Sequence, residues 1–184
     1  FLREKILPNI KPEWGRISYQ IWCAGCSSGE ECYTLAMLLQ DYKDQGGWLP
    51  SFSIVGTDIS EQALAVAQKG RYPVRELENI PALWQQKYLS MDEAGTSFDI
   101  GRAVREKVRF QRMNLLKPSV GLGQFDLVLC RNVMIYFNEE SRKKLIERLY
   151  RALKPGGYLF VGHTELLPRN HELFEYVCPA VYRK

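Results

Sequence analysis

Small residues and two glutamates follow the first apolar run of the chain. Residues 21–24 are apolar, residues 25–29 are small, and a helical pattern of apolar side chains begins directly afterwards. The spacing Gly25-x-x-x-Gly29 lets the backbone turn sharply and lets a ligand approach closely, since a Cβ would intrude there. A strand, a tight turn and a helix in this order predict a nucleotide-type α/β fold.

The charges at the start of that helix indicate which kind of ligand it takes. The spacing differs from the G-x-G-x-x-G of dinucleotide binders, and Glu30 and Glu31 would repel a pyrophosphate. Carboxylates instead favour a cationic ligand that carries sulfonium and ammonium groups. We therefore predict a cofactor of the S-adenosylmethionine (SAM) type. The alternative is that Glu31 only supplies a favourable charge in the first turn of the helix. For Glu30 we prefer that interpretation.

Two polar positions follow later predicted strands. Asp58 comes directly after the apolar residues 52–57, where an acidic side chain can accept hydrogen bonds from a ribose diol. A capping aspartate is the weaker alternative. Asn114 and Leu115 follow the predicted third strand and could contact an adenine. For Asn114, a structural role in a turn is an equal alternative. His163, near the end of the fifth strand, has no partner for hydrolase chemistry, so a structural role is favoured.

The cysteines do not indicate a disulfide framework, because there are five of them. Cys23 and Cys26 form a C-x-x-C pair, for which a thioredoxin-like redox pair is one interpretation. A zinc site would need a second such pair, and the sequence has none. We favour small buried residues in a reducing cytoplasm.

Strands and helices alternate along the chain. This order predicts a mostly parallel sheet with right-handed crossovers and a ligand at the carboxyl ends of the strands. The expected strands begin near Ile17 and cover 52–57, 108–111, 125–130 and 157–161, followed by a closing hairpin within 174–183; the expected helices cover about 30–43, 61–69, 81–89 and 139–153.

Length and charge set further limits. The 184 residues suffice for one domain with a full core, and the net charge of +4 falls short of a nucleic-acid footprint. No apolar run approaches the roughly 20 residues that cross a bilayer. A cluster of basic residues is interpreted as a solvated face rather than a docking patch: Arg102, Arg105, Lys107, Arg109 and Arg112. Because the sequence opens at Phe1 without Met, we expect a fragment of a longer chain.

The chain resembles a known family, the CheR chemotaxis receptor glutamate O-methyltransferases. The segments that carry the resemblance are C-A-G-C-S-S-G-E-E-C-Y-T-L-A at 23–36, G-T-D-I-S at 56–60, A-Q-K-G-R-Y at 67–72, N-L-L at 114–116, F-D-L-V-L-C-R-N-V-M-I-Y-F at 125–137 and L-K-P-G-G-Y-L-F-V-G-H-T-E at 153–165. They stand in the order of the family and cover nearly the whole chain. The run C-R-N-V-M-I-Y-F is specific, whereas L-K-P-G-G occurs in many methyltransferases.

The resemblance implies an α/β, Rossmann-like class I SAM-dependent methyltransferase fold with a mostly parallel seven-stranded sheet, a C-terminal antiparallel hairpin and a small inserted subdomain around residues 90–106. Residues 1–16 would be a lead-in from a missing N-terminal helical domain, and 17–184 the methyltransferase domain. No metal is implied. The implied contacts to SAM are Arg3, Ala24, Gly25, Glu31, Asp58, Ile59, Asn114, Leu115, Arg131 and Asn132, and the implied catalytic residues are Arg3 and Tyr136.

The resemblance also implies a function. The expected reaction is methyl transfer from SAM to glutamate side chains in the cytoplasmic domain of methyl-accepting chemotaxis receptors, which leaves S-adenosylhomocysteine. We expect a monomeric, cytoplasmic bacterial protein that binds no nucleic acid and does not insert into the membrane. A catalytically silent SAM-binding adaptor, or a methyltransferase of the same fold for another substrate, is the alternative.

Overall fold

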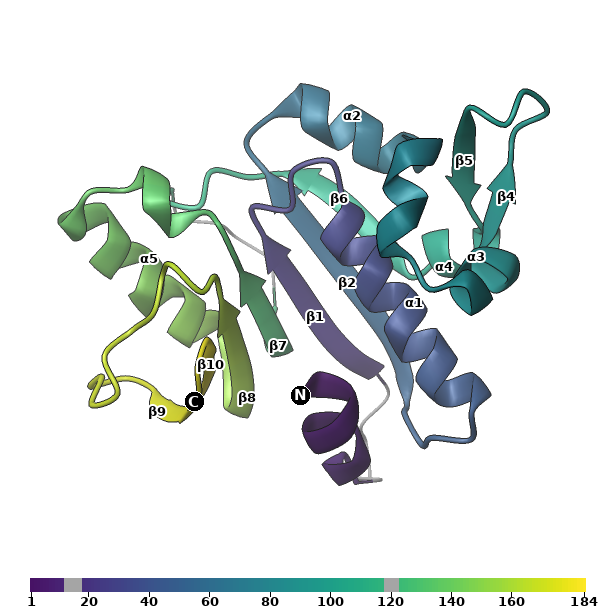
Figure 1. Cartoon of the computed structure of the whole chain (residues 1–184). Helices are drawn as coiled ribbons and strands as arrows, with labels where there is room; N and C mark the ends of the chain where they lie inside the picture. The colour runs from purple at the N-terminus through teal and green to yellow at the C-terminus, as the bar shows by residue number, and fades with distance from the viewer. Residues whose placement is uncertain (12–17, 118–122) are drawn as a thin grey trace.

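A computed structural model describes residues 1–11, 18–117 and 123–184 of the chain. Its centre is a seven-stranded sheet with the strand order β6-β2-β1-β7-β8-β10-β9 (Figure 1). The five strands from β6 to β8 are parallel, and β10 and β9 are antiparallel. The bounds are β1 Ser18–Ala24, β2 Ser51–Asp58, β6 Val108–Arg112, β7 Phe125–Cys130, β8 Leu153–Val161, β9 Glu175–Cys178 and β10 Val181–Arg183. The predicted mostly parallel sheet with a closing hairpin is confirmed.

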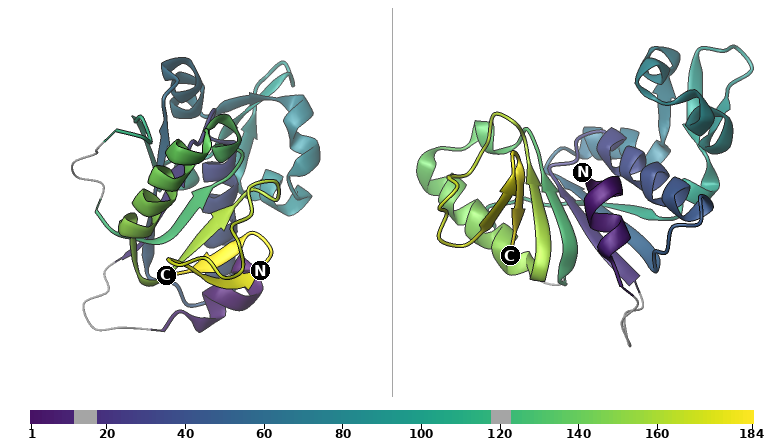
Figure 2. Two further views of the ribbon diagram at one scale, coloured as in Figure 1. Left: turned by 90° about the vertical axis from the view of Figure 1, so that its left-hand side faces the viewer. Right: turned by 60° about the horizontal axis from the view of Figure 1, so that its bottom comes forward.

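Helices cover both faces of this sheet (Figure 2). The helices α1 (Glu30–Asp44) and α2 (Glu61–Lys69) pack on one face, and α5 (Glu139–Ala152) packs on the other. Side chains of a strand alternate between faces, so Ile21 and Cys23 join the core under α1, whereas Trp22 joins the core under α5. All six residues of β7 are buried, as expected for a strand that is covered on both faces.

Side-chain caps fix where two of the helices begin. Ser60 Oγ accepts the Ala63 N–H at 3.2 Å at the start of α2, and Asn138 Oδ1 accepts the Ser141 N–H at 2.9 Å at the start of α5. Gly70 ends α2 in the left-handed conformation that a glycine adopts without strain. The two helices therefore begin and end within one residue of the ranges expected from the sequence, 61–69 and 139–153, because capping depends on local chemistry.

The expected fifth strand covers residues 157–161, whereas β8 begins four residues earlier, at Leu153. Phe125 pairs with Leu153 but Leu127 pairs with Tyr158, so the register shifts between these pairs. Gly156, with φ of 75°, lies in this irregular part of the strand. The glycines therefore permit an irregularity within a strand rather than a separate turn.

A second sheet of three strands lies beyond α1, away from α5 (Figure 1). It consists of β3 (Arg71–Pro73), β5 (Ser97–Ile100) and β4 (Leu89–Met91), all antiparallel. The linking helices are η3 (Val74–Asn79) and α3 (Ala82–Tyr88), and the short helix α4 (Arg102–Arg105) follows β5. This unit therefore begins at residue 71, well before the range 90–106 in which the sequence suggested a small β-subdomain.

The first residues of the chain are packed, which corrects their interpretation as an unpacked lead-in. They form two short helical turns, η1 (Leu2–Ile6) and η2 (Leu7–Asn9). Leu2, Ile6 and Leu7 are buried in the core on the α1 side. The expected strand start at Ile17 and the proposed domain boundary there lie outside the described residues.

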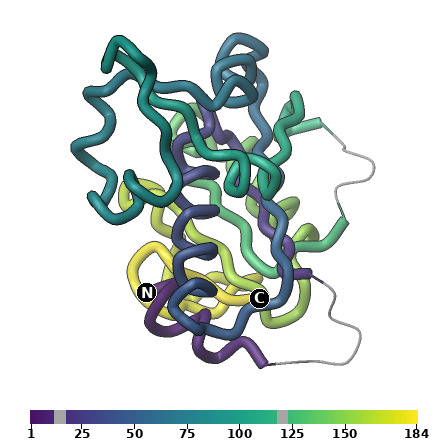
Figure 3. Tube along the Cα trace, turned by 90° about the vertical axis from the view of Figure 1, so that its right-hand side faces the viewer, coloured from purple at the N-terminus to yellow at the C-terminus, as the bar shows by residue number. Residues whose placement is uncertain are grey.

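Both chain ends lie at the end of the molecule away from the three-stranded sheet (Figure 3). Among the described residues, no helix is long and apolar enough to cross a membrane.

Candidate functional site

The turn between β1 and α1 is held against the end of β2. The amides of Gly25 and Cys26 both donate to the Thr57 carbonyl, at 2.8 and 2.9 Å. Gly25, Ser27 and Gly29 all have positive φ, at 79°, 49° and 91°. Three left-handed residues within five positions make this turn tight, which explains the small residues in the sequence.

Gly25 also has no room for a side chain, because a Cβ there would collide with the side chain of Val133 in the segment after β7. We expect Gly25→Ala to lower the free energy of unfolding by about 2–4 kcal/mol, as the sum of a left-handed alanine and an overpacked contact. Urea denaturation measures this loss. Gly95→Ala is the matched control, because Gly95 has φ of 65° but no atom within 4 Å of the added Cβ. Equal losses in the two variants would contradict the contact with Val133.

Asp58 ends β2 beside this turn and organises it. Its Oδ2 accepts the Ser27 N–H at 2.8 Å, and its Oδ1 accepts the Ser60 N–H at 2.9 Å. A carboxylate can accept about four hydrogen bonds, so each oxygen keeps acceptor capacity for a further donor. The capping role and the ribose-binding role, which the sequence presented as alternatives, are therefore compatible in one side chain.

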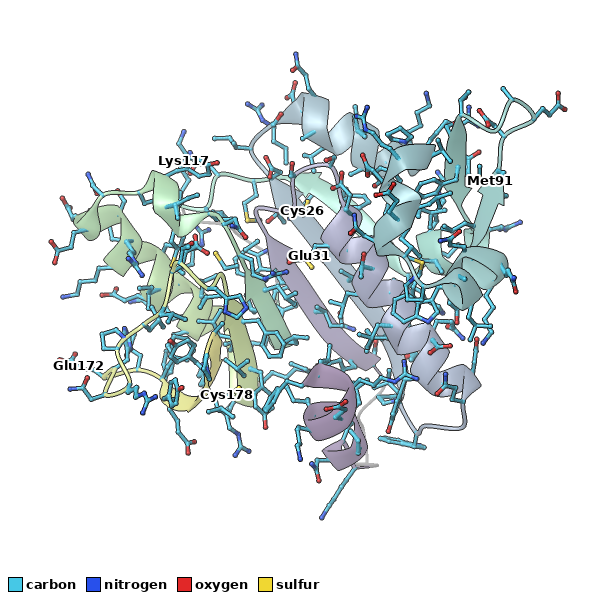
Figure 4. All side chains as sticks on the ribbon, viewed as in Figure 1. Cys26, Glu31, Met91, Lys117, Glu172 and Cys178 are labelled. Carbon is cyan, nitrogen blue, oxygen red and sulfur yellow. The ribbon has the colours of Figure 1, made fainter. Side chains whose placement is uncertain are left out.

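Glu31 and Arg131 form an ion pair between the start of α1 and the end of β7. Arg131 Nη1 lies 2.7 Å from Glu31 Oε2. Figure 4 shows Glu31 close to Cys26, at the carboxyl end of β1. Burial raises the pKa of the Glu31 carboxyl, and the guanidinium of Arg131 offsets only part of this effect. A partly buried carboxylate and a guanidinium side by side match the ammonium and carboxylate groups of an amino acid.

The raised pKa leads to a prediction for Glu31→Gln. A group whose pKa is higher in the folded than in the unfolded chain stabilises the fold less as the pH rises through the folded pKa. The ionised Glu31 therefore costs stability at neutral pH. We expect Glu31→Gln to raise the melting temperature of the ligand-free chain at pH 7, and this gain to vanish at acidic pH where Glu31 is protonated.

The same variant should bind S-adenosylhomocysteine about 10-fold more weakly in calorimetric titration, because one charge-assisted hydrogen bond is lost. Glu30→Gln is the matched control, since Glu30 lies in the same helical turn but is exposed and contacts Ser28. It should change neither the affinity nor the pH dependence. A lower melting temperature for Glu31→Gln than for the wild type at pH 7 would contradict the claim that the ionised Glu31 lowers the stability of the ligand-free chain.

The segment 131–136 completes this edge of the sheet. Asn132 adopts a left-handed conformation with φ of 58°, and Tyr136 ends the short helix η4 (Met134–Tyr136) with 80% of its surface exposed. The amides of Asn132 and Val133 donate to the carboxylate of Glu165, at 2.6 and 2.7 Å. Glu165 was not predicted as a site residue; the signal that could have revealed it is an acidic residue shortly after a buried strand, as for Asp58.

The other predicted contacts differ in their surroundings. Ile59 is exposed beside Asp58, whereas Ala24 is buried and can offer only its backbone. Asn114 Oδ1 accepts the Leu116 N–H at 2.9 Å, which is the turn role. Leu115 is only 7% exposed and packs in the core under α5. Adenine contacts by Asn114 and Leu115 stay a prediction.

Arg3 is not brought to this edge of the sheet. Its Nη1 pairs with Asp41 at 2.9 Å and its Nη2 donates to Gln45 at 2.6 Å. Asp41 lies ten residues after Glu31 in α1, about 15 Å along the helix. The assignment of Arg3 to the cofactor and to catalysis disagrees with this placement, because the buried Asp41 holds the guanidinium at the opposite end of α1.

The cysteines are free thiols, and all but Cys178 are buried. Cys23, Cys26 and Cys32 form a hydrogen-bonded cluster, and these bonds together with burial leave the pKa of each thiol raised. In the part of the chain that the structure describes, no group of three His, Cys, Asp or Glu side chains is arranged to hold a metal ion. The burial of four of the five thiols agrees with cysteines that act as small core residues.

Comparison with known proteins supports the same class of site. Residues 1–182 match the family described as CheR methyltransferase, SAM binding domain. The chain is 38% identical to a chemotaxis protein methyltransferase of Borreliella burgdorferi over an alignment of 188 positions, which covers 100% of this chain and 66% of that protein. It is 34% identical to chemotaxis protein methyltransferase 1 of Pseudomonas aeruginosa, over 99% of this chain and 68% of that protein. The chain thus spans about two thirds of the length of these relatives.

The fold is shared with a solved structure of PKMT2 from Rickettsia typhi, with a TM-score of 0.52, 18% identity and coverage of 87% of this chain and 24% of that one. The sheet order, the turn after β1 and the matched family together define a class I SAM-dependent methyltransferase domain. More narrowly, the chain belongs to the CheR methyltransferase family, of which it is the SAM-binding domain.

Proposed function

We propose that this chain transfers the methyl group of SAM to glutamate side chains of chemotaxis receptors and forms glutamate methyl esters. The supporting observation is the convergence of Asp58 and the Glu31–Arg131 pair at the carboxyl edge of a sheet whose sequence matches the CheR family. The relatives named as chemotaxis protein methyltransferases support the choice of substrate.

The donor set at this edge fits SAM. Asp58 would accept the two ribose hydroxyls with its remaining lone pairs. Glu31 would bind the ammonium group and Arg131 the carboxylate, so that each charge of the pair gains a partner of opposite sign. The Gly25 turn, Ala24, Ile59 and Asn132 would line the ligand, and Asn114 with Leu115 would lie on the adenine side.

The proposed acceptor needs little chemical activation. A glutamate side chain has an ordinary pKa of about 4.3, so it is already an anion at neutral pH and requires no general base. Bound SAM supplies a methyl group on a positively charged sulfur. The protein has to hold a carboxylate oxygen in line with that methyl group, at about 3 Å and away from water. We assign the orienting hydrogen bond to the hydroxyl of Tyr136, which is exposed at the end of η4.

We further propose a cytoplasmic monomer that acts on the cytoplasmic domain of receptors and binds no nucleic acid. The basic cluster between residues 102 and 112 supports the last of these points, the absence of nucleic-acid binding, because several of its side chains are engaged within the chain. Arg102 pairs with Glu106 at 2.6 Å and Arg112 pairs with Glu61 at 2.8 Å. Arg105 donates to the Gln68 carbonyl. Such local pairs indicate a solvated face rather than a nucleic-acid surface.

Incubation with receptor-containing membranes and methyl-tritiated SAM tests this function. We expect label on the receptor that alkali releases as volatile methanol, because a methyl ester is hydrolysed and an N-methyl group is not. Label in added RNA or in alkali-stable form would favour a different substrate. Binding of S-adenosylhomocysteine without any transfer would favour the silent adaptor.

A further inference from the structure

Glu165 is a buried carboxylate whose hydrogen bonds all connect it to the backbone around the site. It is 1% exposed. Its Oε2 accepts the amides of Asn132 at 2.6 Å and Gly162 at 3.0 Å, and its Oε1 accepts those of Val133 at 2.7 Å and Ile135 at 3.2 Å. Within the described ranges no Lys, Arg or His forms an ion pair with this carboxylate. Four backbone amides therefore take the place of a cation.

Gly162 and Arg142 hold Glu165 in this arrangement. A Cβ at Gly162 would collide with Oε2 of Glu165, so only glycine permits the bond from its amide. On the other side, Arg142 donates to the carbonyl oxygens of Glu165 and Leu166, at 3.2 and 3.3 Å. This bond fixes the backbone of Glu165 to α5. Glu165 is thus held by Gly162, the residue after β8, and by Arg142 of α5, and its carboxylate reaches across to the segment after β7.

That segment contains the residues to which we assign the chemistry. Arg131 pairs with Glu31, and Tyr136 follows Ile135 directly. Asn132 adopts a left-handed conformation, which asparagine tolerates better than most residues that carry a side chain. The bond from the Asn132 amide to Glu165 constrains this conformation.

We propose that Glu165 is a positioning residue of the methyltransferase site, which sets the conformation of residues 131–136 and thereby the places of Arg131 and Tyr136. This inference rests on the proposed function. A carboxylate suits the role because it presents only acceptors, about four in number, to four donors. A glutamine would keep one carbonyl oxygen and would turn its NH₂ group toward amides that also donate.

The test compares Glu165→Gln with Asp126→Asn. Asp126 is the matched control because it is also a buried carboxylate, 4% exposed, but lies at the start of β7, where it accepts the Gln20 amide and pairs with Lys154 at 2.9 Å. Three quantities are measured: hydrogen exchange of peptides covering 131–137, calorimetric affinity for S-adenosylhomocysteine, and kcat and KM with receptor membranes.

For Glu165→Gln we expect exchange in 131–137 to accelerate at least 10-fold, affinity to fall about 10-fold and kcat to fall more than 10-fold, with little change in the receptor KM. For Asp126→Asn we expect a lower melting temperature with unchanged affinity, kcat and local exchange. Should Glu165→Gln fail to fold, Gly162→Ala displaces the same carboxylate and must give the same faster exchange in 131–137.

Unchanged exchange and affinity in Glu165→Gln would overturn the proposal. Equal losses of affinity and kcat in Asp126→Asn would also overturn it, since they would show general destabilisation. The exchange measurement does not depend on methylation, so it tests the role of Glu165 even if the wild-type chain transfers no methyl group. Absence of methyl transfer by the wild-type chain would contradict only the proposed function.

Discussion

Replacing Asp58 by alanine is expected to weaken the binding of S-adenosylhomocysteine by about 100-fold or more. Two hydrogen bonds between a carboxylate and the ribose hydroxyls would be lost, each contributing about 1.5–3 kcal/mol. The amides of Ser27 and Ser60 would also lose their acceptor, so the turn after β1 would be held less firmly. Isothermal titration calorimetry measures the change.

A control must separate the lost acceptor from a loosened turn. Ser60→Ala removes the cap at the start of α2 but keeps the Asp58 carboxylate and the Ser60 amide. It should cost about 1 kcal/mol of stability and leave the affinity nearly unchanged. Wild-type affinity in Asp58→Ala would remove this residue from the binding site.

The second large effect is expected in turnover. Tyr136→Phe removes only a hydroxyl from a side chain that is 80% exposed, so the fold should be unaffected. Loss of one hydrogen bond to a charged acceptor, about 1.5–3 kcal/mol, corresponds to a decrease in kcat of about 10- to 100-fold. The affinity for S-adenosylhomocysteine should stay within about twofold of wild type, because the hydroxyl acts on the receptor carboxylate.

Tyr158→Phe is the control for this measurement. Tyr158 lies in β8 opposite Leu127, packs against the core on the α1 side and has no part in the proposed chemistry. Its variant should retain the wild-type kcat. If Tyr136→Phe retained it as well, the carboxylate would have to be oriented by another group.

Periodicity and capping chemistry made most of the central fold predictable. The run of residues 125–130 is apolar at nearly every position, which indicates a strand covered on both faces, and β7 is fully buried. Ser60 and Asn138 signal helix starts through local hydrogen bonds that need no tertiary information. The three-stranded sheet was harder to foresee, because β3 and β4 have three residues each and pair across intervening helices.

The roles of Arg3 and Glu165 could not be predicted, because they depend on contacts between residues that are far apart in the sequence. The partner of Arg3 is Asp41, 38 residues away, and nothing in the order of residues signals this pair. Glu165 reaches Asn132 over 33 residues, so its role emerges only once β7 and β8 lie side by side. Asp58 and Glu31 were accessible to prediction because each directly follows a strand or a turn whose type is evident.

The central claim is that a positively charged nucleoside binds between the Gly25 turn, Glu31 and Asp58. A crystal structure of the chain soaked with S-adenosylhomocysteine tests it most directly. We predict electron density for the ligand with both ribose hydroxyls within hydrogen-bonding distance of Asp58, and with its amino-acid group between Glu31 and Arg131. Density for a phosphate-bearing dinucleotide at this edge of the sheet, or none at all at saturating ligand, would contradict the account.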